Sequence, residues 1–128
     1  MDSKTKEIIG ESLREIIGES LGGHSDPITS VSFSPDSTRI VTLSNTNAII
    51  LDAIGVLIGE LNGHSSGINC VSFSPDSTIL VTGGNDKLAI IWDSKTGALI
   101  GELKGHSSII NTVNFYPDGK LIITGSND

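Results

Sequence analysis

Three histidines carry the most versatile chemistry in this sequence, because an imidazole can bind a metal ion or move a proton near neutral pH. Each lies in the same tripeptide, Gly-His-Ser, at His24, His64 and His106, which stand 40 and 42 residues apart. Nearly equal steps along a chain indicate copies of one structural unit, whereas a catalytic site gathers side chains of different kinds. The sequence also offers no His-rich metal spacing, no Gly-rich phosphate loop and no motif of paired acids. We therefore expect a repeat protein with no catalytic residue, no metal site and no cofactor.

Other segments of the chain repeat in step with the histidines. The octet Val-Ser-Phe-Ser-Pro-Asp-Ser-Thr occupies 31–38 and recurs unchanged at 71–78, and a looser copy begins at Val113. Within each period, short apolar runs rich in β-branched residues alternate with turn residues such as Pro-Asp, which indicates four short strands. Four strands in every period of about 40 residues is the pattern of a β-propeller blade. The sequence therefore predicts an all-β fold of four-stranded antiparallel blades.

The middle period resembles the WD repeat, a family whose units form such blades. Four side chains are similar to the family's structural residues, namely His64, Thr82, Asp86 and Trp92. The resemblance implies a hydrogen-bonded chain in which Asp86 accepts from His64, His64 meets Thr82, and Thr82 meets the Trp92 indole N–H. A fully satisfied buried chain of this kind fixes one arrangement of strands. A catalytic His–Asp–Thr set is the competing interpretation, and it lacks an evident nucleophile site or oxyanion donors.

The other two periods depart from this pattern. The first has Leu51-Asp52 where the family has its Trp-Asp pair, so His24 and Thr42 are expected to keep only part of the network. The third repeats the first half of the pattern, at His106, Thr124 and Asp128.

A direct repeat, Glu-Ile-Ile-Gly-Glu-Ser-Leu, occupies 7–13 and 15–21 near the N-terminus. One interpretation is an amphipathic helix, because its apolar residues lie near helical spacing, although Gly10 and Gly18 weaken it. The other interpretation comes from aligning the periods on their Gly-His pairs, which places 5–21 on the third and fourth strands of a blade. We favour the second interpretation, and the sequence leaves both open.

The second interpretation divides the chain into four parts. Residues 5–21 form the outer two strands of a shared blade, 22–62 the first blade, 63–104 the second blade, and 105–128 the inner two strands of a shared blade. Three blades do not close a ring, because propellers typically have about 4–8 blades. We therefore expect the chain to bind itself, as a dimer with six blades, slightly favoured, or a trimer with nine. The residues expected at this inter-chain closure are Ile8, Ile9, Ile16, Ile17, Leu21, Val113, Phe115, Leu121 and Ile123.

Composition excludes several classes of partner. The formal net charge is −7, and no cluster of Lys and Arg could neutralise phosphates, so we expect no nucleic-acid partner. The apolar runs are too short to span a membrane, and the first ten residues lack the pattern of a signal peptide. Cys70 is the single cysteine and cannot form an internal disulfide, so we expect a cytoplasmic protein in which it is a small apolar strand residue.

The family resemblance implies a non-enzymatic scaffold that binds a protein or peptide through loops at one end of the propeller. Those loops are expected near Asp26, Ser66, Ser108, 45–47 and Lys87. Two alternatives stay open. In the first, the chain is an assembly fragment or module of a larger WD-repeat protein with no partner of its own. In the second, it is a hydrolase with a site in the central channel, which the lack of catalytic motifs disfavours.

Overall fold

The computed structural model describes residues 28–44 and 47–127, and every element of regular structure in them is a β-strand. The strands are β1 (Ile28–Phe33), β2 (Arg39–Ser44), β3 (Ala48–Asp52), β4 (Leu57–Glu60), β5 (Ile68–Phe73), β6 (Ile79–Gly84), β7 (Ala89–Asp93), β8 (Leu99–Leu103), β9 (Ile110–Phe115) and β10 (Ile122–Ser126). No helix among these residues is long and apolar enough to cross a membrane. Both interpretations of 5–21 lie outside the described residues.

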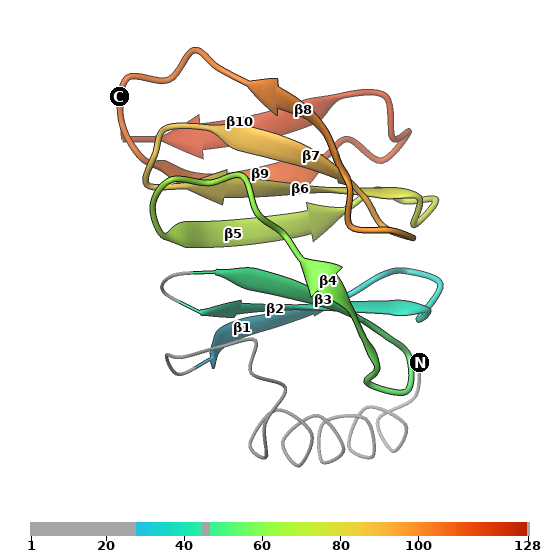
Figure 1. Ribbon diagram of the computed structural model, residues 1–128. Helices are drawn as coiled ribbons and strands as arrows, with labels where there is room; N and C mark the ends of the chain where they lie inside the picture. Colours follow the sequence, from blue (N-terminus) through green and yellow to red (C-terminus); the bar gives the residue numbers. More distant parts are fainter. Residues whose placement is uncertain (1–27, 45–46, 128) are drawn as a thin grey trace.

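The strands form three antiparallel sheets in chain order (Figure 1). The first sheet has the order β1-β2-β3-β4, the second has the order β5-β6-β7-β8, and the third pairs β9 with β10. Within each sheet, every strand pairs with the next one along the chain, because turns of a few residues permit only antiparallel neighbours. The predicted all-β fold with four-stranded antiparallel sheets is confirmed, whereas closure into a ring stays a prediction.

The three sheets share one register. Phe33 pairs with Ile40 in the first sheet, and the same step pairs Phe73 with Leu80 and Phe115 with Ile122. Each first strand pair also has a register shift at its far end, at the same place in all three sheets. A residue in one sheet therefore has a defined counterpart in the next, and differences between counterparts can be compared directly.

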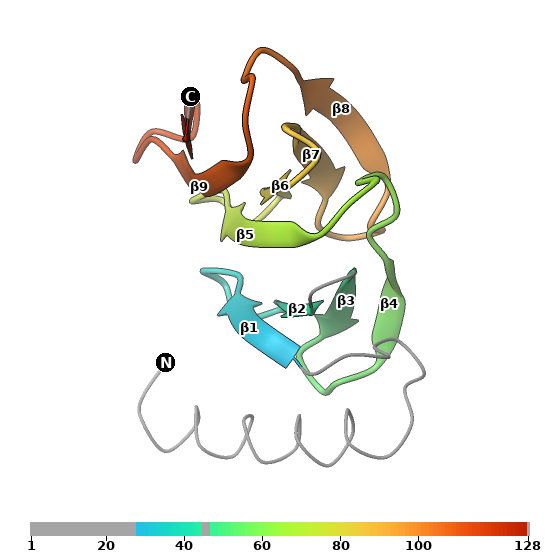
Figure 2. The ribbon, with the colours of Figure 1, turned by 90° about the vertical axis from the view of Figure 1, so that its left-hand side faces the viewer.

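The first strands of the three sheets lie on the same side of the molecule. Figure 2 shows β1, β5 and β9 next to one another, with β4 and β8 on the opposite side, and β5 contacts both β1 and β9. We call β1, β5 and β9 the inner strands, and β4 and β8 the outer strands.

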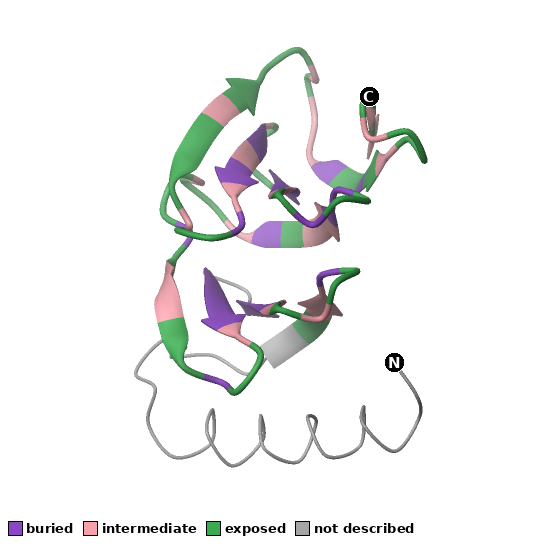
Figure 3. Ribbon diagram, turned by 90° about the vertical axis from the view of Figure 1, so that its right-hand side faces the viewer, coloured by how far each residue is buried: buried purple, intermediate pink, exposed green. Residues whose placement is uncertain are grey.

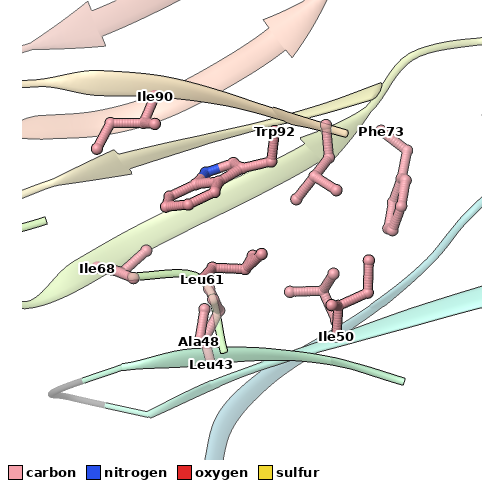
Figure 4. Packing of buried hydrophobic residues seen from close by; sticks show 10 residues of the cluster. Leu43, Ala48, Ile50, Leu61, Ile68, Phe73, Ile90 and Trp92 are labelled. Carbon is pink, nitrogen blue, oxygen red and sulfur yellow. The ribbon is translucent and has the colours of Figure 1, made fainter. Parts of the chain in front are cut away.

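Apolar side chains fill the space between neighbouring sheets. Successive strand residues point to opposite faces of a sheet. In the second sheet both sets include buried apolar residues, so the sheet has two apolar faces. Figure 4 shows Trp92, Ile90 and Phe73 of the second sheet packed against Ile50 and other residues of the first. The opposite face of the second sheet packs against the third, in a cluster built from Val81, Ala89, Ile110 and Val113. Two of the core clusters are thus layers between sheets, and a third, formed by Ile40, Ile49 and Leu51, lies on the other face of the first sheet.

The turn that joins the first two strands of each full sheet is held by an aspartate. Ser74 and Thr78 each donate a side-chain hydrogen bond of 2.7 Å to Asp76, and the Thr78 backbone N–H donates at 3.0 Å. Hydrogen bonds that favour the charged form of a carboxyl group lower its pKa. The bonds from Ser74 and Thr78 lower the pKa of Asp76 to about 2. In the first sheet, the bonds from Thr38 and Ser34 lower the pKa of Asp36 in the same way.

We predict that these turns make the protein sensitive to acid. A carboxyl group whose pKa is lower in the folded state stabilises the fold above its unfolded pKa, and the stabilisation is lost as pH falls toward the folded pKa. The free energy of unfolding should therefore be nearly constant near neutral pH and should decline between about pH 4 and about pH 2. Asp76→Asn keeps an acceptor oxygen but cannot ionise, so its decline should be shallower. Urea titrations followed by Trp92 fluorescence at fixed protein concentration measure both slopes, and equal slopes would contradict the assignment.

We also predict that Gly83 is required for the contact between the second and third sheets. A Cβ at Gly83 would lie 2.5 Å from Ile110 Cγ2 and 2.8 Å from Cys70 Sγ, both in a packed layer. Gly83→Ala should lower the free energy of unfolding by about 1–3 kcal/mol, the usual cost of overpacking. Gly101→Ala is the matched control, because nothing lies within 4 Å of its new Cβ. Equal urea midpoints for the two variants would show that the layer adapts freely.

Candidate functional site

The four WD-like residues of the second sheet form one continuous hydrogen-bonded chain. The two Asp86 carboxylate oxygens lie 3.0 and 2.9 Å from His64 Nδ1. His64 Nε2 lies 2.7 Å from Thr82 Oγ1, and the Trp92 indole N–H donates to the same oxygen at 2.8 Å. Asp86 comes from the turn between β6 and β7, and His64 from the loop before β5. The chain therefore ties a loop, a turn and two strands together.

Donor and acceptor roles along this chain are consistent with a neutral imidazole. A carboxylate only accepts, so Nδ1–H donates to Asp86, and Nε2 is then free to accept from the Thr82 hydroxyl. The Thr82 oxygen in turn accepts from Trp92. The backbone N–H groups of Ser65 and Leu88 also donate to Asp86. Every member thus has a partner.

Burial separates this chain from solvent. The side chains of His64 and Asp86 are 1% and 4% exposed, and Thr82 is buried. A general base and a nucleophile must reach a substrate. The catalytic interpretation of this His–Asp–Thr set therefore does not fit the geometry, and the chain acts as a structural clamp.

The counterparts in the other sheets form part of the same arrangement. His106 Nε2 lies 2.7 Å from Thr124 Oγ1 in the third sheet, while Asp128 lies outside the described residues. In the first sheet Thr42 is buried, and His24 lies outside the described residues. Leu51 pairs with Ile40 as Trp92 pairs with Leu80, so a buried leucine occupies the tryptophan position.

The loops expected to bind a partner carry few large side chains. Ser66 and Lys87 are exposed and Ser108 is half-buried, whereas Asp26 and residues 45–46 lie outside the described residues. Tyr116 is exposed, in the turn between β9 and β10, while the three Phe residues contact the core.

Each of the last two sheets also has a pair of exposed amides that was not predicted from the sequence. Asn69 Nδ2 donates to Asn85 Oδ1 at 2.8 Å, and Asn111 Nδ2 donates to Asn127 Oδ1 at 2.6 Å. The signal was available, since Asn69 and Asn111 are separated by the same 42 residues as the last two histidines.

A polar groove of about 400 Å³ lies between the first and second sheets, among the turns that join β1 to β2, β5 to β6 and β7 to β8. Arg39 Nε donates to the Ser94 carbonyl at 2.8 Å, and the Asp36 N–H donates to Ser77 Oγ at 3.0 Å. Two cationic and two anionic side chains line the groove, namely Arg39, Lys95, Asp36 and Asp76. These contacts join the two sheets at a site that the sequence analysis did not single out.

The residues expected at the inter-chain closure divide into three groups. Val113 and Phe115 pack within the chain, against the second sheet. Leu121 and Ile123 are exposed. The five apolar residues expected from the N-terminal segment lie outside the described residues, namely Ile8, Ile9, Ile16, Ile17 and Leu21.

No metal centre is built from the residues that the structure describes, since no three His, Cys, Asp or Glu side chains gather among them. Cys70 lies in β5, half-buried in the layer against the third sheet, and burial raises the pKa of its thiol. The raised pKa keeps it protonated near neutral pH, as expected for a packing residue.

We predict that Thr82 is the central member of the buried chain. Thr82→Val has nearly the same shape but leaves the Trp92 N–H and one His64 nitrogen without a partner, which should lower the free energy of unfolding by about 1–3 kcal/mol. Thr78→Val is the control, because it also removes a 2.7 Å hydrogen bond, but at an exposed site where water replaces it. Urea titration followed by Trp92 fluorescence measures both, and an equal loss in the two variants would contradict a special role for the buried chain.

The comparisons with known proteins agree with this geometry. Residues 15–51, 55–93 and 97–128 each match the family model described as WD domain, G-beta repeat. The matches begin nine residues before His24, His64 and His106 respectively. A search of curated proteins found no match. Because the three matched segments together cover well over half of the residues, the chain belongs to the WD domain, G-beta repeat family.

Proposed function

We propose that this chain is a non-enzymatic WD-repeat scaffold for protein–protein interaction, and that it assembles with copies of itself into a closed propeller ring. WD repeats generally serve as interaction scaffolds, and the buried hydrogen-bonded chain is a structural clamp. One observation supports self-assembly. Apolar residues that are buried in one sheet are exposed at the counterpart positions of another.

The junction between the second and third sheets shows how two neighbours cover each other. Val81 of β6 and Val113 of β9 lie in one layer and are 0% and 4% exposed. The counterpart of Val113 in the first sheet is Val31, because both pair with the threonine of the buried chain, and Val31 is 43% exposed. The counterpart of Val81 in the third sheet is Ile123, which is 56% exposed.

These two exposed residues fit each other across a junction between copies. If the third sheet of one copy stands before the first sheet of the next, Ile123 meets Val31 as Val81 meets Val113. The contact is head-to-tail, because each copy offers a different face, and it closes a ring when the rotation between copies fits.

The outer strands show a second uncovered area. Leu61 and Leu103 end the same pentapeptide, Leu-Ile-Gly-Glu-Leu, but they are 2% and 40% exposed. Leu61 is covered because the second sheet continues outward to β7 and β8, while the described part of the third sheet ends at β10. Figure 3 shows β8 as mostly exposed, in contrast to the buried β7.

The N-terminal segment of the next copy is the proposed cover. Aligned on the Gly-His pairs, residues 5–21 correspond to the third and fourth strands of a sheet, the two that would follow β10. The family match supports this alignment, since the match at residue 15 begins at the same distance from its histidine as those at 55 and 97. Among the described residues β10 has one partner, and an unpaired strand edge is a template for another chain.

The scaffold function then belongs to the assembled ring. The exposed amide pairs join the inner strands β5 and β9 to the residues that follow β6 and β10, and a ring would repeat them around its central opening. A partner-free assembly piece would form the same ring, so a binding experiment on the ring separates these two functions.

We predict that the chain forms a stable assembly in solution. Light scattering on a size-exclusion column should give twice the chain mass of 13.4 kDa for a six-bladed dimer, or three times that mass for a nine-bladed trimer. Val31→Asp and Ile123→Asp should each shift the mass toward one chain, because a carboxylate would be buried in an apolar layer. Ser66→Asp adds the same charge on an exposed loop and should leave the mass unchanged. A folded wild-type monomer would contradict self-assembly.

A further inference from the structure

The polar groove between the first and second sheets shows how two neighbouring sheets meet within the chain. The corresponding residues of the third and first sheets would meet at a junction between copies. In the groove, Arg39 at the start of β2 donates to the Ser94 carbonyl in the turn between β7 and β8. This turn lies over the first sheet, because a Cβ on Gly97 would be 3.3 Å from Ile50 and 3.7 Å from Leu61. The start of a second strand thus meets the last turn of the following sheet.

Register identifies the counterparts of these residues at the chain junction. Leu121 precedes Ile122 in the third sheet as Arg39 precedes Ile40 in the first. In the last turn of the first sheet, which is one residue shorter than that of the second, Ile54 stands where the second sheet has Lys95 and Thr96, because the N–H of each donates to the aspartate that ends the preceding strand. Polar residues of the groove therefore have apolar counterparts in both of the sheets that face a neighbouring copy.

Those apolar counterparts are among the most exposed large apolar residues in the part of the chain that the structure describes. Leu121 is 60% exposed and Ile54 is 77% exposed, and Val56 in the same turn is exposed as well. Isolated exposed apolar residues are common on protein surfaces. Here, however, the two groups occupy the two halves of one junction, and Leu121 and Ile54 stand where the internal junction has charged or polar residues.

We propose that Leu121 of one copy packs against Ile54 and Val56 of the next, so that the junction between chains is apolar where the junction within the chain is polar. The inference rests on the proposed ring and names a second copy of this chain as the partner. Water would be excluded from these side chains only in the assembly. The contact thereby adds affinity to the closing junction and distinguishes it from the internal one.

A charge-pair experiment tests the contact. Leu121→Lys and Ile54→Glu each place a charge against an apolar surface, so each variant alone should assemble with a dissociation constant raised about tenfold or more. The double variant Leu121→Lys/Ile54→Glu places opposite charges at every junction and should recover part of the affinity. The two single variants, mixed in equal amounts, should assemble more tightly than either alone, because a mixed dimer or trimer contains one Lys–Glu junction and one Leu–Ile junction. Light scattering across a dilution series measures each mass, and circular dichroism checks that each variant is folded.

The outcomes separate this inference from the proposed ring. A monomeric wild type would overturn the ring, and this contact with it. A wild-type assembly whose affinity neither single variant reduces would overturn the contact and leave the ring standing. Weakened single variants with no recovery in the double variant or the mixture would also overturn it, because the two positions would then act without touching.

Discussion

Apolar layers between sheets are the interaction on which the rest of this structure depends. Side chains alternate along each strand and both sets are largely apolar, so each sheet gains stability from a neighbour on either face. Fully burying one Leu, Ile or Val side chain contributes about 1.5–3 kcal/mol. The layer between the first and second sheets buries ten apolar residues, including Trp92 and Phe73. A face without a neighbour loses this contribution. The exposed apolar face of the third sheet therefore indicates where a further sheet would pack.

The buried polar chain has a different role within this apolar frame. A hydrogen bond contributes only about 0.5–1.5 kcal/mol net, but an unpaired buried polar group costs more than that. The chain from Asp86 to Trp92 therefore selects one arrangement of the loop, the turn and the strands, while the layers supply most of the stabilisation. Leu51 in the first sheet shows that a sheet can form with an apolar residue at the indole position, where it is buried in a cluster with Ile40 and Ile49.

Near-identity of the repeats makes their differences meaningful. Arg39, Ile79 and Leu121 occupy the same position in the three sheets, and only Arg39 reaches a carbonyl of the following sheet. Ile54 and Lys95 share the same hydrogen bond to an aspartate but differ in chemistry. Such changes keep the strand pairing and alter the side chains at the edges of each sheet. Sheets with the same fold can therefore present different surfaces to their neighbours.

The sequence by itself determined the repeat and its four-strand plan, and its resemblance to the WD repeat implied the members of the buried chain. Those features depend on local patterns: the alternation of β-branched residues, the Pro-Asp turns, and side chains such as His64 and Thr82 that recur at a fixed spacing. The groove around Arg39 could not be predicted, because it joins residues of two different sheets and no repeated motif marks which residues meet there. Only the tertiary structure decided which faces are covered. Leu61 and Leu103 end identical pentapeptides, and they differ in burial because one has a complete sheet beside it and the other does not.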